Sequence, residues 1–68
     1  MTLGDLISVL NCIDITIMEN DNESGDITPL FDGKSDYFRM SEMESFMNVL
    51  FIAPHRFRSG GIFVMVER

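Results

Sequence analysis

The sequence is poor in the groups that usually stabilise a small protein. Its 68 residues include one cysteine, one histidine and no tryptophan. A single cysteine, Cys12, cannot form an internal disulfide, and together with one histidine it is too little for a structural zinc site. We expect Cys12 to be a buried structural thiol. A chain of this length predicts one domain, 1–68, which must rely on apolar packing or self-association for its stability.

Basic residues and long apolar runs are also scarce, and each shortage excludes a class of function. The formal net charge is -6, which argues against direct nucleic-acid binding, because that requires a basic surface to neutralise phosphates. No apolar run approaches the ~20 residues of a membrane span. The start has an acid, Asp5, where a secretory signal would have Lys or Arg. We therefore expect a cytoplasmic protein that binds neither nucleic acid nor membrane.

Hydrophobic residues make up 46% of the chain, and their spacing predicts two short helices. Residues 2–10 carry an apolar stripe at helical spacing, with Thr2 as the N-cap of a capping box. A second helix follows Ser41, which forms a capping box with Glu44. The segment 35–40 before it is either a turn or a separate helical turn. The apolar stripe of the second helix consists of Met43, Phe46, Met47 and Leu50.

Alternating and continuous apolar segments predict four strands. Residues 13–18 and 27–31 pair as a hairpin around a polar turn, with Pro29 at a sheet edge because proline lacks an N–H. In residues 49–53 and 61–66 both the odd and the even positions are apolar, which indicates strands that are covered on both faces.

The predicted order of elements is α-β-β-α-β-β, which indicates an α+β fold. We expect a four-stranded, mainly antiparallel sheet with two short helices on one face. Asp32-Gly33 is expected to form a turn after the second strand. The other face could take a second copy of the chain and form a homodimer. The predicted core consists of Leu3, Leu6, Ile7, Leu10, Ile13, Ile15, Ile17, Phe46, Leu50, Ile52, Val64 and Val66.

Charge is distributed unevenly along the chain. Residues 1–33 contain seven acids and no base, whereas residues 34–68 contain five bases and four acids. One interpretation is that the charges only keep a small apolar domain in solution. A second is that the acids attract a basic partner, such as a nucleic-acid-binding protein, and that a basic-aromatic loop adds a contact. A third is that copies of the chain pair head to tail through their opposite charges. The candidate protein-binding site of the second interpretation comprises Asp14, Glu19, Asp21, Glu23, Asp26, Asp32, Arg56, Phe57 and Arg58.

No pattern in the chain predicts catalysis, a cofactor or a metal site. Glu19, Asp21 and Glu23 alternate like calcium ligands, but Ser24 stands where an EF-hand needs glycine and Leu30 where it needs glutamate. The only histidine, His55, has no local carboxylate and nucleophile that would make it a general base. The sequence therefore predicts no catalytic residue, no cofactor and no metal.

Several short sequence features of the chain also occur together in a group of known proteins. The features are Thr2-Leu3-Gly4-Asp5-Leu6-x-x-Val9-Leu10, an Ile-rich strand, an acidic turn, Leu30-Phe31-x-Gly33-Lys34, Ser35-Asp36 and a closing pair of apolar strands. In these features the chain resembles short, acidic, mostly uncharacterised proteins of phages and mobile elements of gut Firmicutes. The resemblance implies no activity, cofactor or site residue. It favours a non-enzymatic accessory or inhibitor protein that binds a host protein, as anti-CRISPR proteins do. The alternative is a structural protein that assembles only with itself.

Overall fold

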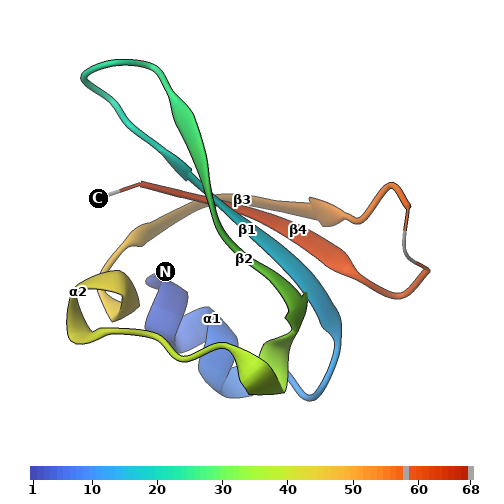
Figure 1. Ribbon diagram of the computed structural model, residues 1–68. Helices are drawn as coiled ribbons and strands as arrows, with labels where there is room; N and C mark the ends of the chain where they lie inside the picture. The colour runs from blue at the N-terminus through green and yellow to red at the C-terminus, as the bar shows by residue number, and fades with distance from the viewer. Residues whose placement is uncertain (58, 68) are drawn as a thin grey trace.

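The chain forms one four-stranded sheet with two short helices on one of its faces (Figure 1). The structure is a computed structural model that describes residues 1–57 and 59–67. The strand order is β2-β1-β4-β3, in which β1–β2 and β3–β4 are antiparallel and the central pair β1–β4 is parallel. The predicted α+β fold and its order of elements are confirmed. Along the chain the elements are α1 (Leu3–Val9), β1 (Asp14–Asn20), β2 (Ile27–Lys34), the 3-10 helix η1 (Ser35–Tyr37), α2 (Glu42–Ser45), β3 (Asn48–Pro54) and β4 (Ile62–Glu67).

Local sequence explains where the helices begin. Thr2 caps α1 by accepting a hydrogen bond on Oγ1 from the Asp5 N–H at 3.2 Å. In turn, the Asp5 carboxylate accepts a bond from the Thr2 N–H. Ser41 and Glu44 form the same reciprocal pair at α2. Both predicted capping boxes are confirmed, and each satisfies N–H groups that a helix start leaves without partners.

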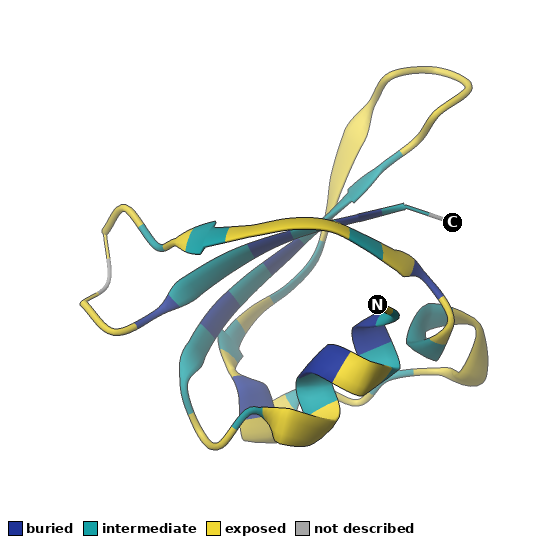
Figure 2. Cartoon of the chain, turned by 180° about the vertical axis from the view of Figure 1, so that it is seen from behind, coloured by how far each residue is buried: buried dark blue, intermediate teal, exposed yellow. Residues whose placement is uncertain are grey.

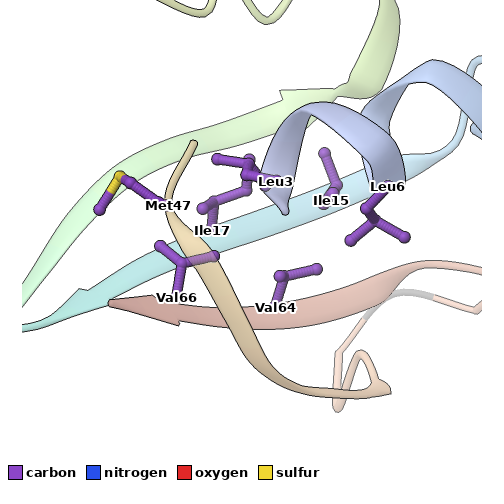
Figure 3. Close-up of a cluster of buried hydrophobic side chains, with 7 residues drawn as sticks. All are labelled: Leu3, Leu6, Ile15, Ile17, Met47, Val64 and Val66. Carbon is purple, nitrogen blue, oxygen red and sulfur yellow. The ribbon is translucent and has the colours of Figure 1, made fainter. Parts of the chain in front are cut away.

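The hydrophobic core lies between the helices and one face of the sheet. Ile15 and Ile17 on β1 alternate with more exposed residues because successive side chains point to opposite faces of a strand. Figure 2 shows the same alternation of burial along the central strands. Ile7 and Leu10 are partly buried against this core. The buried residues, drawn in Figure 3, are Leu3, Leu6, Ile15, Ile17, Met47, Val64 and Val66.

Three residues of the predicted core are exposed instead. The prediction extended the apolar stripe of the second helix through Phe46 to Leu50, but α2 ends at Ser45, and β3 begins at Asn48. Helical spacing therefore stops applying, and Phe46 is 71% exposed. Leu50 and Ile52 lie on β3, which is an edge strand with one long side open to solvent. Met47, which follows the helix, fills the core in their place.

The predicted turn at Asp32-Gly33 is wrong, because β2 continues through both residues. Asp32 pairs with Thr16 and Gly33 with Ile15 across the β1–β2 hairpin. A side chain at Gly33 would stand 3.3 Å from the Phe31 ring, so this ring occupies the space that glycine leaves free. Pro29 does lie on an edge strand as predicted, and the register of the hairpin shifts beside it.

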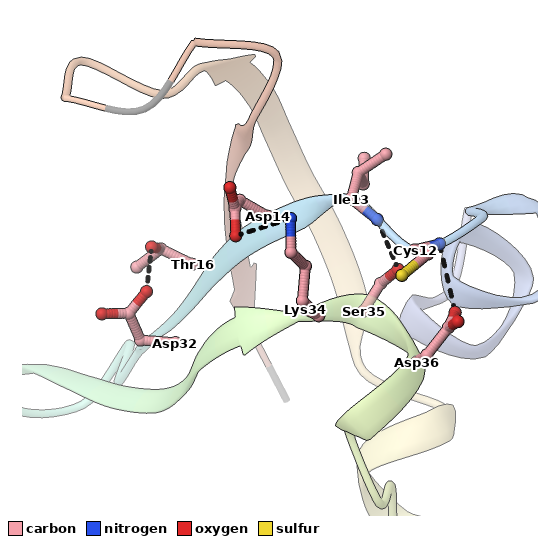
Figure 4. A network of polar contacts seen from close by, with 8 residues as sticks. All are labelled: Cys12, Ile13, Asp14, Thr16, Asp32, Lys34, Ser35 and Asp36. Atoms are coloured by element: carbon pink, nitrogen blue, oxygen red, sulfur yellow. Dashed lines mark hydrogen bonds and ion pairs between the residues drawn. The ribbon is translucent and has the colours of Figure 1, made fainter.

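The connection between α1 and β1 is also built differently from the prediction. Cys12 is exposed and has a positive φ of 50°, so its thiol is not part of the core. Its N–H donates to Asp36 Oδ1 at 3.1 Å, and the buried Ser35 accepts a bond from the Ile13 N–H (Figure 4). The segment that was predicted as a turn or a helical turn forms η1, and its first two residues bind this connection.

The N-terminus covers part of the open edge of β3. The Leu3 N–H donates to the Met47 carbonyl at 2.8 Å, and the Val49 N–H donates to the Met1 carbonyl at 3.0 Å. The register between β3 and β4 also shifts between Val49 and Phe51, and Pro54 ends the strand. Such features limit the unpaired N–H and C=O groups that an edge strand offers to other chains. Within the described residues, no helix is long and apolar enough to cross a membrane.

Candidate functional site

The face of the sheet opposite the helices, here called the open face, carries a mixed polar and aromatic surface. Thr16 and Met18 point to this face because the alternate residues of β1 are in the core. Phe63 of β4 pairs with Thr16 on one side and with Ala53 on the other. The Phe51 and Phe63 rings stack with their centres 6.2 Å apart and their planes 25° apart. An aromatic pair therefore lies on a face that the helices leave uncovered.

A groove of about 670 Å³ is formed where the start of the β3–β4 connection, at residues 55–57, meets the open face. Its volume lies within the usual range of ligand sites. Met18, Phe51, Ala53, Pro54, Phe57 and Phe63 supply its apolar lining, and Thr16, Asp32, His55 and Arg56 supply its polar lining. We call this site the groove.

A chain of hydrogen bonds attaches the β3–β4 connection to the open face. Thr16 Oγ1 lies 3.0 Å from His55 Nε2 and donates to Asp32 Oδ1 at 3.0 Å. The Phe57 main-chain N–H donates to His55 Nδ1 at 3.1 Å. We call the set of His55, Thr16, Asp32 and the Phe57 N–H the His55 latch. Figure 4 shows its Thr16–Asp32 part.

The directions of these bonds determine what the His55 latch can do chemically. A main-chain N–H can only donate, so Nδ1 carries no proton, and the ring proton of neutral His55 lies on Nε2. His55 therefore donates to Thr16, and the Thr16 hydroxyl proton points to Asp32. In this arrangement His55 is not a base toward Thr16. The His55 latch fixes the connection over the sheet instead of activating a nucleophile.

Arg56 is the exposed cation of the groove. It forms no ion pair with any residue of the described ranges, where the one salt bridge joins Lys34 and Asp14 at 3.4 Å. The Phe57 ring beside it is 87% exposed and makes an edge-on contact with the His55 ring at 6.3 Å. A charged and an aromatic side chain are thus both available to a ligand at the same end of the groove.

The acidic residues 19–26 form the end of the β1–β2 hairpin, which we call the hairpin end. Asp21 accepts a bond from the Glu23 N–H at 2.9 Å, and its own N–H donates to the Asp26 carbonyl at 2.9 Å. Gly25 adopts a positive φ of 77° in this turn, which glycine does without strain. Because β1 and β4 are parallel, the hairpin end lies at the opposite end of the sheet from the β3–β4 connection (Figure 1).

The structure separates the acids that the sequence grouped as one surface. Asp14 pairs with Lys34 near the start of β1. Asp32 lies in the groove together with Arg56 and Phe57. Arg58 lies outside the described residues. The four acids of the hairpin end, Glu19, Asp21, Glu23 and Asp26, are the part of the predicted acidic site that stays together.

Several groove residues were not among the predicted site residues. Thr16, Met18 and Phe63 face opposite to the core positions of their strands, so the alternation of each strand was the available signal. The continuous apolar run of β3 gives no signal that distinguishes Phe51, and the residues next to His55 in sequence do not indicate its partners. No local pattern connects His55 with Thr16, because they are 39 residues apart in sequence.

Neither metal geometry nor known relatives assign a role to this chain. No group of three or more His, Cys, Asp or Glu side chains in the described ranges could hold a metal ion. No family model matches the chain, and neither the curated proteins nor the solved structures include a significant match.

Proposed function

We propose that this protein is a non-enzymatic interaction module that binds a partner protein through the groove. One observation carries the proposal: an aromatic floor lies on the open face, and the exposed Phe57 ring lies beside it. Aromatic side chains together with arginine are the residues most enriched at the energetic centres of protein interfaces. A partner side chain that enters the groove would cover apolar surface that water now contacts.

The His55 latch supports this proposal because it holds the groove in shape before a partner arrives. A loop that is already ordered loses less conformational entropy on binding than a mobile one. Both ring nitrogens of His55 have partners in the folded chain, so the connection is attached to β1 independently of any ligand. The proposed partner is a protein of the bacterial host, in line with the resemblance to phage and mobile-element proteins, and the proposed location is the cytoplasm.

A second candidate function is self-assembly, which a different observation favours. The consecutive residues Leu50, Phe51 and Ile52 are all exposed on the edge strand β3. Exposed apolar residues on an edge strand are a known route to association between identical chains. A homodimer would cover them without any external partner.

Site-specific photo-cross-linking tests the proposal and separates the two candidates. A benzoylphenylalanine is placed at Phe57, inside the groove, and in a control variant at Tyr37, which is also aromatic and exposed but lies on η1. Each variant is irradiated in a lysate of the source organism. We expect a distinct partner protein to be cross-linked from position 57 and not from position 37, and an excess of unlabelled wild-type protein should compete with it.

Other outcomes would contradict the proposal. Cross-links from position 57 to copies of the same chain only would favour self-assembly. The same set of proteins captured from both positions would mean that the groove has no special role. Substituting Phe51→Thr in the position-57 variant should weaken the partner cross-link, because it removes half of the aromatic stack that forms the groove floor.

A further inference from the structure

We propose that the groove recognises an apolar side chain, best an aromatic one, that is followed directly by an Asp or Glu in an exposed segment of the partner. This inference rests on the proposed function, since it describes the partner segment that the groove would bind. It is carried by the combination of an apolar floor with an arginine in the lining, Arg56, that forms no ion pair within the part of the chain that the structure describes.

The floor selects for an apolar or aromatic group. Phe51 and Phe63 present a stacked pair, and Phe57 stands beside them with 87% of its surface exposed. Aromatic rings pack favourably on one another in offset or edge-on arrangements. The groove volume of about 670 Å³ is ample for one large side chain and the main chain next to it.

The polar groups of the groove other than Arg56 are already hydrogen-bonded to one another. Thr16 both donates and accepts within the His55 latch, and both nitrogens of His55 are in use. Asp32 accepts the Thr16 hydroxyl. These groups hold the site together, so a ligand that took the proton of His55 or Thr16 would have to break an existing bond, at a cost comparable to the bond that it gains.

The remaining group, Arg56, sets the charge of the ligand. Arg56 forms no ion pair with any other described residue and is one of the residues that line the groove. A carboxylate beside the bound side chain would complement this charge and can accept two parallel hydrogen bonds from it. Asp32, the one carboxylate among the lining residues, already accepts the Thr16 hydroxyl, which leaves Arg56 as the charged lining residue with no hydrogen bond or ion pair to another described residue.

The overall negative charge makes the apolar anchor necessary. Simple anions are repelled by the net charge of the molecule at long range, and one exposed ion pair contributes little free energy. An apolar side chain supplies the larger part of the binding energy. The adjacent carboxylate supplies the preference for an acidic neighbour over a neutral or basic one. A ligand with both features therefore binds better than a ligand with either one.

Capped tetrapeptides test this inference directly. The three probes are glycine-tryptophan-aspartate-glycine and its counterparts with asparagine or lysine in place of aspartate. Binding is followed through protein amide NMR shifts, and the absence of tryptophan from the chain leaves the probe indole signal unobscured. We expect groove amides to shift, with the aspartate peptide binding about two- to fivefold more tightly than the asparagine peptide and the lysine peptide binding most weakly.

Two variants assign the effect to its residue. Arg56→Gln should abolish the difference between the aspartate and asparagine peptides while keeping the tryptophan-dependent binding. Arg39→Gln, which removes an exposed arginine outside the groove, should leave the order of the peptides unchanged. Equal affinities in the wild type, an order that persists in Arg56→Gln, or no shifts at the groove amides would each overturn the inference.

This experiment can fail independently of the proposed function. If a partner is cross-linked from position 57 but the peptides bind with equal affinity, the binding function is supported and the proposed preference for an acidic neighbour is wrong. The expected order of peptides without any cross-linked partner would support the chemistry of the groove and remove the function as a protein-binding module.

Discussion

At the scale of single residues, two isoleucines of one hairpin illustrate how burial sets the cost of a substitution. Ile15 is fully buried on β1, whereas Ile27 on β2 is 54% exposed. Ile15→Ala should lower the free energy of unfolding by about 2–5 kcal/mol, because it removes buried methyl groups and leaves a cavity. Ile27→Ala should cost less than about 1 kcal/mol. Urea unfolding followed by circular dichroism measures both, and equal losses would contradict the described core.

A second residue-scale prediction concerns the His55 latch. Thr16→Val keeps the shape of the side chain but removes the hydroxyl that joins His55 to Asp32. The His55 ring then loses its acceptor, so the Phe57 N–H should lose its partner as well. We expect faster amide exchange at Phe57 and a loss of about 0.5–1.5 kcal/mol in stability.

Thr28→Val is the matched control for this substitution, because Thr28 is exposed on β2 and takes no part in the His55 latch. It should leave the exchange rate of the Phe57 amide unchanged. If Thr16→Val also left that rate unchanged, and the ring proton of His55 still lay on Nε2 by nitrogen NMR, the latch would not hold the connection.

At the scale of elements, Gly4 shows where helix propensity and packing oppose each other. Within an isolated helix, Gly4→Ala would be expected to stabilise α1 by up to ~1 kcal/mol. In the fold, the added methyl group would stand 3.0 Å from the Ser45 carbonyl oxygen and 3.2 Å from the Ser45 Cβ on α2. Because the closest atom belongs to main chain, we expect the contact to cancel the gain or reverse it.

Thermal or urea unfolding of Gly4→Ala, compared with Ser8→Ala in the same helix, checks this prediction. Ser8 is exposed and its hydroxyl only donates to the Asp5 carbonyl. Ser8→Ala should therefore show the gain in helix propensity that Gly4→Ala does not. A gain of ~1 kcal/mol in Gly4→Ala would mean that α1 and α2 are farther apart than described.

At the scale of the whole molecule, the separation of the hairpin end from the groove gives a test of which surface binds. Neither the Glu23 nor the Asp26 side chain forms a hydrogen bond or ion pair within the described residues. Replacing both with lysine should leave the free energy of unfolding within about 0.5 kcal/mol, because both positions are exposed. It should also preserve the partner cross-link from position 57.

A variant with Glu23→Gln and Asp26→Asn is the control, since it removes the charges without reversing them. Loss of the cross-link in the lysine variant alone would move the binding surface to the hairpin end and support the basic partner that the sequence predicted. Loss of the cross-link in both variants would indicate that the acids attract the partner at long range, and the position-57 cross-link of the chain with the wild-type hairpin end should then weaken as salt is added.

Much of the local structure could be predicted because it depends on neighbouring residues. The capping boxes at Thr2 and Ser41 are reciprocal bonds across three positions, and the alternation around Ile15 and Ile17 is a property of one strand. The edge position of Pro29 follows from its missing N–H. In each case the physical cause lies within one element, so the sequence alone determined the element.

The groove and the limits of the core depended on tertiary structure. Phe46 is exposed and not in the core because α2 ends at Ser45, shortly before β3 begins. Helical spacing in the sequence does not show where the helix ends. Thr16, Asp32 and His55 come from three separate elements, and they meet only because the sheet places β1 between β2 and β4. The chain by itself determined which segments are helix or strand, through contacts between near neighbours. The open face, the groove and the separation of the acids were decided by strand order, because it brings together residues that are distant in sequence.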